Sequence, residues 1–171
     1  MSGRRWPVPR RFESAPEGAR LDPDLAVPFE DEEAGLAWQM PVPPWQRYDR
    51  PLTSLVGERL VLGTFDLPPA PPDPDCTPRA AIDAMPPDGA FIYLFEYLDL
   101  AARFKQRIPE RTGEITLGPE MAFECMGESR KATWRQHGRA FQAHVSIGPR
   151  ASDELKRDVR SILNSIQVKP R

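Results

Sequence analysis

The residues of this chain best suited to covalent chemistry are Cys125 and His144. A thiol held beside an imidazole is the pair that thiol enzymes use as nucleophile and base. One cysteine and one histidine occur together in many small domains, so the pair predicts activity only where geometry supports it. We therefore assign no catalytic residues and favour a protein that is not an enzyme. A small hydrolase or thiol enzyme using Cys125 and His144 is the first alternative.

The two cysteines, Cys76 and Cys125, are the only ones in the chain. They form no CxxC pair and match no zinc-binding spacing, so we expect neither a metal site nor a cofactor. Two interpretations stay open. The cysteines form a disulfide, which requires an oxidising compartment, or they are two buried free thiols, since cysteine is among the most buried residue types.

Two further groups of charged residues are candidate sites. The carboxylates are Glu96, Glu120, Glu124 and Glu128. Nothing in their spacing places two of them across a hydrolase cleft, and we expect them at solvated strand edges. The basic group, with Trp134 and Phe141 between its members, consists of Arg130, Lys131, Arg135, Arg139 and Arg150. Basic and aromatic side chains on one sheet face bind single-stranded nucleic acid, so a nucleic-acid-contacting hairpin at 130–147 is the second alternative.

Composition limits the partners. The chain has 171 residues with 40% hydrophobic and 28% charged residues, and its net charge is −2. Nucleic acid and polybasic membrane anchoring both require a basic field, which this balance does not supply. No apolar run approaches the ~20 residues of a membrane span, and the start lacks the apolar region of a signal peptide. The default compartment is cytoplasmic, and an exported form stays open if the true start lies upstream.

Proline divides the chain. Of 21 prolines, 17 lie between Pro7 and Pro87. Proline lacks a backbone donor and is excluded from helix interiors and central strands. We therefore predict a proline-rich irregular arm over residues 1–57 and an α+β domain over 58–171. Trp38, Trp45 and Tyr48 lie among these prolines, and exposed aromatics beside stiff backbone suit docking. They are the predicted partner-binding residues, and the predicted partner is a protein.

The second half has the periodicity of an antiparallel sheet of about five strands, covered on one face by a C-terminal helix. In the proline-rich part before this domain, a short strand is predicted at 35–40. The remaining predicted strands are 59–67, 90–98, 114–118, 121–125 and a hairpin of 130–135 with 139–147. A helix is predicted at 78–84, and an amphipathic helix near 98–107 is an alternative to the end of one strand.

The last helix has the clearest pattern. Ser152 is suited to cap its N-terminus. Apolar residues then follow at helical spacing along one face, namely Leu155, Val159, Ile162, Leu163 and Ile166. Burying five such side chains contributes on the order of 8–15 kcal/mol before entropy is subtracted. This helix must therefore cover the sheet.

The end of the chain, Ile162-Leu163-Asn164-Ser165-Ile166-Gln167-Val168 after the strand 141–148, resembles the C-terminus of PsbP/Mog1-like domains. Residues 76–168 also resemble bacterial proteins with a proline-rich start. The PsbP-like resemblance implies an antiparallel sheet closed by a helix and a short final strand. It also implies a binding or assembly role, since such domains mostly act as binding or assembly factors. Our functional prediction is a non-catalytic binding or assembly module.

Alkylation of the protein, denatured without reduction, decides the state of the cysteines. A disulfide between Cys76 and Cys125 predicts that no thiol is modified until a reductant is added. Two modified thiols before reduction would rule the bridge out, and the intact mass provides the readout.

Overall fold

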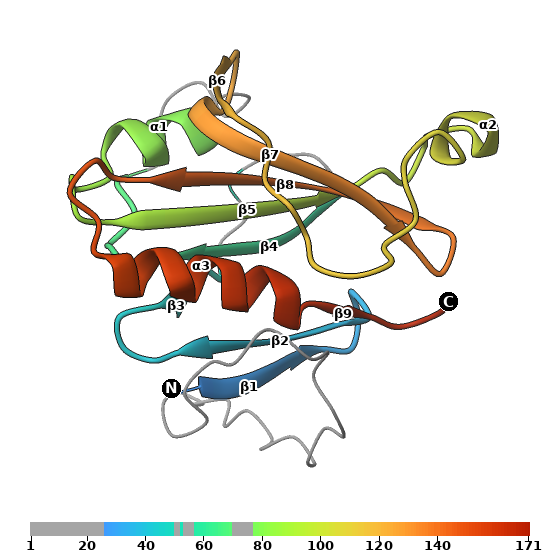
Figure 1. Ribbon diagram of the computed structural model, residues 1–171, viewed down its shortest axis with the longest axis horizontal. Coiled ribbons are helices and arrows are strands. Elements are labelled where there is room, and N and C mark those ends of the chain that lie inside the picture. The colour runs from blue at the N-terminus through green and yellow to red at the C-terminus, as the bar shows by residue number, and fades with distance from the viewer. Residues whose placement is uncertain (1–25, 50–51, 53–56, 70–76) are drawn as a thin grey trace.

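A computed structural model describes residues 26–49, 52, 57–69 and 77–171 (Figure 1). These residues contain nine strands and three helices. In chain order they are β1 (Ala26–Asp31), β2 (Leu36–Pro41), β3 (Gln46–Arg47), β4 (Glu58–Gly63), α1 (Thr77–Asp83), β5 (Ala90–Glu96), α2 (Ala102–Lys105), β6 (Glu120–Phe123), β7 (Gly127–Gln136), β8 (Arg139–Ile147), α3 (Asp153–Ser165) and β9 (Gln167–Val168). The predicted α+β class with an antiparallel sheet and a C-terminal helix is confirmed.

The strands form two antiparallel sheets rather than one. The larger has six strands in the order β3-β4-β5-β8-β7-β6, and the smaller has the order β1-β2-β9. Helix α3 lies between the two sheets (Figure 1). The helix therefore covers the large sheet with one side and supports the small sheet with another.

Helix α3 forms where its apolar stripe predicts. The hydroxyl of Ser152 accepts a hydrogen bond from the Leu155 amide at 3.1 Å, which caps the first turn. All five predicted stripe residues are buried, and Ile162 is 0% exposed. Their partners come from both sheets, including Leu36 of β2 and Leu94 of β5. The placement of this helix is confirmed.

The predicted hairpin is also confirmed, as β7 and β8. Its turn residues His137 and Gly138 have φ values of 53° and 74°. Two successive positive φ angles match the right-handed twist of the flanking strands, and glycine makes the second inexpensive. The strict alternation in β8 places Phe141 and Val145 against α3 and His144 on the opposite face.

A second cluster of apolar residues covers the face of the large sheet that points away from α3. Its buried members are Leu52, Val61, Phe65, Ala81, Phe91 and Tyr93. The predicted helix at 78–84 is α1, and Ala81 joins it to this cluster. Strand β5 is therefore buried on both faces, as its double apolar pattern indicates.

One local prediction is wrong. No strand forms at 114–118: the Ile115 amide donates to the side chain of Asn164 at 2.6 Å, and the loop touches β7 through one hydrogen bond, from the Gly118 amide to the Lys131 carbonyl at 2.9 Å. The alternative of a helix near 98–107 is realised in part, as α2, which has no buried residue. No helix among the described residues is long and apolar enough to cross a membrane.

Residues 26–49 belong to the folded core. Strand β2, predicted at 35–40, places Leu36, Trp38 and Met40 in the same cluster as α3, and β2 pairs with β9. The folded region therefore extends well before residue 58, where the sequence suggested a boundary. Residues 1–25 of the predicted arm lie outside the described residues.

Replacement of Ile162 by aspartate is expected to unfold the domain. The change removes a fully buried side chain and introduces a carboxylate with no partner, which together cost about 4 kcal/mol or more, most of the stability of a typical domain. Thermal denaturation followed by circular dichroism measures the loss. Arg160→Asp, on the exposed face of the same helix, is the matched control and should melt close to the wild type. An unchanged midpoint for Ile162→Asp would contradict this placement of α3.

Candidate functional site

The two tryptophans predicted to bind a partner are core residues. Trp38 and Trp45 are 2% and 1% exposed. Trp38 stacks on Phe29 of β1 with ring centres 5.7 Å apart, and both tryptophans belong to the cluster around α3. The premise that they are exposed is wrong, because β2 alternates its apolar residues toward the helix and the chain after it folds back to β3.

Tyr48, the third predicted docking residue, is half-buried. Its hydroxyl donates to the carbonyl of Phe65, and its ring lies against Gly63, where any side chain would collide with it. Burial raises the pKa of Tyr48 to about 12, with the Phe65 hydrogen bond lowering it and the charge of Asp66 raising it further. The side chain acts as a brace between the segment before β4 and the segment after it.

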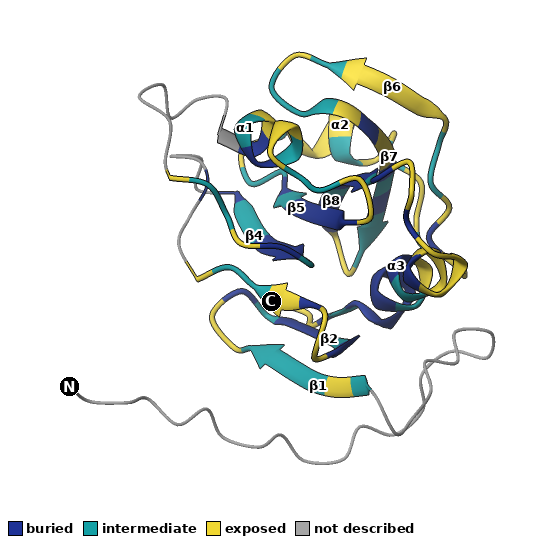
Figure 2. Cartoon of the chain, turned by 90° about the vertical axis from the view of Figure 1, so that its left-hand side faces the viewer, coloured by how far each residue is buried: buried dark blue, intermediate teal, exposed yellow. Residues whose placement is uncertain are grey.

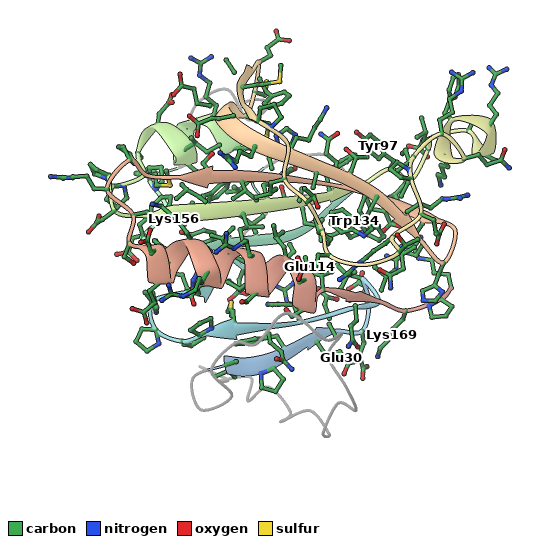
Figure 3. All side chains as sticks on the ribbon, in the orientation of Figure 1. Glu30, Tyr97, Glu114, Trp134, Lys156 and Lys169 are labelled. Atoms are coloured by element: carbon green, nitrogen blue, oxygen red, sulfur yellow. The ribbon has the colours of Figure 1, made fainter. Side chains whose placement is uncertain are left out.

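His144 belongs to a chain of hydrogen-bonded polar side chains on the face of the large sheet opposite α3. Its Nδ1 is 3.1 Å from the Ser129 hydroxyl, and its Nε2 is 2.7 Å from the amide nitrogen of Gln142. The hydroxyl of Tyr97, labelled in Figure 3, donates to the same amide group at 2.5 Å. Burial, with a smaller effect of the Lys131 charge, lowers the pKa of His144 to about 4. The imidazole is neutral at pH 7, and its two nitrogens are occupied.

The predicted thiol pair is not assembled. Cys125 lies in the turn between β6 and β7 and is disulfide-bonded, so it offers no free thiol as a nucleophile. His144 is 4% exposed and Ser129 is 0% exposed, which leaves a substrate no access to either side chain. Cys76 lies outside the described residues, and its pairing with Cys125 stays a prediction.

The two aromatic residues of the predicted basic hairpin, Trp134 and Phe141, are not on its surface. Trp134 and Phe141 stack with centres 5.7 Å apart in the core beside α3; Figure 3 labels Trp134 there. Arg139 is 5% exposed, and Arg135 pairs with Glu110 at 2.9 Å. The alternation of the strands buries the aromatic side chains that a nucleic acid would need.

The strongest electrostatic feature is a buried ion pair between Glu96 and Arg139. The Arg139 guanidinium contacts both carboxylate oxygens at 2.8 Å. It also donates to three backbone carbonyls, those of Ala34, Gly35 and Lys169, at 2.7, 3.2 and 3.2 Å. Glu96 is 3% exposed, so the expectation that it lies at a solvated edge is wrong.

We call this arrangement the Glu96 clamp, defined by Glu96, Arg139, Arg59 and Arg171. Arg59 of β4 reaches Glu96 at 2.7 Å and Arg171 reaches it at 3.3 Å. Burial alone would raise the pKa of Glu96, but the hydrogen bonds and charges of Arg139 and Arg59 outweigh it and lower the pKa to about 2. The clamp connects the large sheet, the turn between β1 and β2, and the C-terminal tail.

A groove of about 600 Å³ lies on the described surface. It lies between α1, the hairpin of β6 and β7, and the end of β8. Its apolar lining comes from Ile82, Met85, Ala122, Phe123 and Ile147, and its charged lining from Arg79, Asp83, Glu120 and Glu128. Arg79 and Asp83 face each other at 3.6 Å, so the two glutamates leave the groove with an excess of negative charge.

Strand β6, on one side of this groove, is the terminal strand of the large sheet. Among the described strands it pairs only with β7. Three of its four residues are exposed (Figure 2), and Met121 is 55% exposed. Its outer edge therefore carries backbone donors and acceptors that no described strand uses.

A smaller hollow of about 250 Å³ lies beside the turn between β1 and β2. Its wall includes Asp31 and Arg47, which pair at 2.7 Å. Across the parts of the chain that the structure covers, no three histidine, cysteine, aspartate or glutamate side chains cluster as a metal site.

The class that the geometry defines is an α+β protein in which one helix lies between two antiparallel sheets. Comparison with protein-family models finds no match for this sequence, and comparison with curated proteins finds no significant similarity. The resemblance to PsbP/Mog1-like domains stays a prediction.

Sequence reasoning missed the Glu96 clamp and the groove. A signal for the clamp exists, because Glu96 follows Ile92 and Leu94 on the strand face that packs on α3, where a lone carboxylate requires a cationic partner. Nothing local identifies Arg139 as that partner. The groove had no signal, since it is formed by three segments that are distant in the sequence.

Replacement of Glu96 by glutamine is expected to destabilise the fold by about 3–5 kcal/mol, because it leaves the buried Arg139 charge uncompensated. Asp153→Asn removes an exposed ion pair with Lys156 and should cost about 1 kcal/mol or less. Urea denaturation of both variants measures the difference. Equal stability of Glu96→Gln and wild type would show that the clamp contributes nothing.

The same variant tests the pH dependence. Because the folded-state pKa of Glu96 is lower than its ordinary value of 4.5, its stabilisation is complete above that value and is lost as the pH falls toward 2. Wild type should therefore lose more stability than Glu96→Gln between these two pH values. Parallel acid dependence of the two proteins would contradict the lowered pKa.

Proposed function

We propose that this chain is a non-catalytic binding module that accepts an extended segment of a partner protein in the groove between α1, β6 and the end of β8. The observation that supports this is the unpaired edge of β6 beside the groove. An extended peptide that pairs with such an edge satisfies its backbone groups, while side-chain pockets beside it select the sequence. Edge and groove lie together here.

The lining of the groove favours a particular peptide. Ile82, Phe123 and Ile147 offer apolar contacts in the groove. Met121 is not part of the lining, but it is exposed on β6 and adds a flexible apolar side chain of the kind found at adaptable binding surfaces. Glu120 and Glu128 make a basic side chain the complementary partner. The ligand we propose is therefore an extended segment in which apolar and basic residues alternate.

The buried state of the alternative sites also supports a binding role over catalysis. Cys125 is not a free thiol, and both ring nitrogens of His144 are engaged inside the sheet. The order β8, α3, β9 is compatible with the PsbP/Mog1-like resemblance, which implies binding or assembly rather than a reaction.

The test uses immobilised peptides in which valine alternates with lysine, and a matched set in which valine alternates with glutamate. We expect wild type to bind the lysine set more tightly. Glu120→Lys combined with Glu128→Lys should weaken this binding about tenfold or more, because opposite charge becomes like charge. Ala122→Pro should weaken binding to both sets, because proline blunts a strand edge.

Glu114→Lys is the matched control. Glu114 is exposed on the loop beside α3 (Figure 3), and this loop does not line the groove. The control should bind the lysine set like wild type. Equal retention of the two peptide sets, or unchanged binding by both groove variants with intact melting curves, would overturn the proposal.

A further inference from the structure

Helix α2 projects from one end of the large sheet with little underneath it (Figure 1). It has no buried residue, so core packing does not explain why its side chains have their present chemistry. Phe104 is 39% exposed and is one of four large hydrophobic residues that are exposed among those described. An exposed aromatic side chain on a projecting element indicates a docking surface.

The base of the projection is firmly attached. The Arg111 guanidinium donates to the carbonyls of Ile166 and Asn164 at the end of α3, the latter at 2.8 Å. The backbones of Pro109, Arg111 and Arg135 are joined by two hydrogen bonds of 2.8 Å. The fold thus holds the projection in place while leaving its tip bare, which reduces the entropy that docking must overcome.

The tip combines an aromatic side chain with positively charged side chains around it. The guanidinium carbons of Arg103 and Arg107 lie 4.7 and 5.4 Å from the centre of the Phe104 ring. Lys105 lies between them in sequence, and Asp99 is the nearest carboxylate along the chain before α2. The tip is therefore basic although the whole chain has a net charge of −2, so the average charge conceals it.

We propose that this tip, residues 101–107, docks onto an anionic lipid surface. The tip is convex and suits a flat, extended partner better than a hollow one. Its arginines lie at the level of the phenylalanine ring, and at a membrane interface aromatic rings and basic side chains occupy that same headgroup level. Guanidinium groups bind phosphate with two parallel hydrogen bonds. The contact is independent of the peptide groove, which lies at the α1 end of the sheet.

The experiment is co-sedimentation of the full chain with vesicles of phosphatidylcholine alone and of phosphatidylcholine with roughly one third phosphatidylserine. We expect wild type to bind only the anionic vesicles, and less as salt screens the charges. Arg103→Ala with Arg107→Ala should weaken partitioning about 30-fold, since each basic side chain contributes about fivefold at an anionic surface. Phe104→Ala should weaken it at high and low salt alike.

Arg157→Ala with Arg160→Ala removes the same charge from the exposed face of α3 and should bind like wild type. The Phe104→Trp variant should show a shift of its tryptophan fluorescence to shorter wavelength, relative to wild type, on anionic vesicles only. The proposal would be overturned if the wild-type protein failed to sediment with anionic vesicles. If that protein were retained on polyglutamate instead, the partner of the tip would be an acidic protein. The proposal would also be overturned if Arg157→Ala with Arg160→Ala lost as much vesicle binding as Arg103→Ala with Arg107→Ala. Glu120→Lys with Glu128→Lys should leave vesicle binding intact, which separates this test from that of the groove.

Discussion

The Arg139 guanidinium is the buried polar contact that joins the large sheet to the turn between β1 and β2 and to the C-terminal tail. Arginine has five N–H donors, and Arg139 uses five hydrogen bonds, two to Glu96 and three to backbone carbonyls of the small sheet and the tail. A buried ion pair is costly unless its remaining donors are satisfied. The three remaining N–H donors of Arg139 bond to carbonyls in the turn after β1 and of the residue after β9. The buried charges of the large sheet are therefore fully hydrogen-bonded only when the small sheet is in place.

This constraint complements the apolar packing of α3. Hydrophobic contact is not directional, so polar contacts must fix the register of the small sheet on α3. Gln39 of β2 hydrogen-bonds with Ser165 at the end of α3, and β2 pairs with β9. The Arg139 guanidinium adds a directional contact at the turn after β1. Helix α1, which borders the groove, lies at one end of the large sheet, and α2 projects at the other (Figure 1). The two proposals together describe an adaptor that holds a partner protein near an anionic surface.

Local pattern was sufficient for the parts of the fold whose side chains repeat along the chain. The stripe of α3 and the alternation of β8 predicted both elements. Trp38 and Trp45 were misplaced because nearby prolines suggested an arm, whereas alternation in β2 directs Trp38 to the helix. Glu96 was misplaced because its partner Arg139 lies on another strand, and residue type does not identify a pairing formed only by the tertiary fold. The groove is formed by three converging segments, and the exposure of α2 depends on what the rest of the fold leaves uncovered, which no local pattern encodes.

The central claim is that Glu96 and Arg139 stabilise the fold through each other. A double-mutant cycle with Glu96→Gln, Arg139→Met and the combined variant, read by urea denaturation, measures this coupling directly. The account predicts that the double variant is more stable than the sum of the single losses implies, by about 2–3 kcal/mol. Losses that add to within about 0.5 kcal/mol would contradict it.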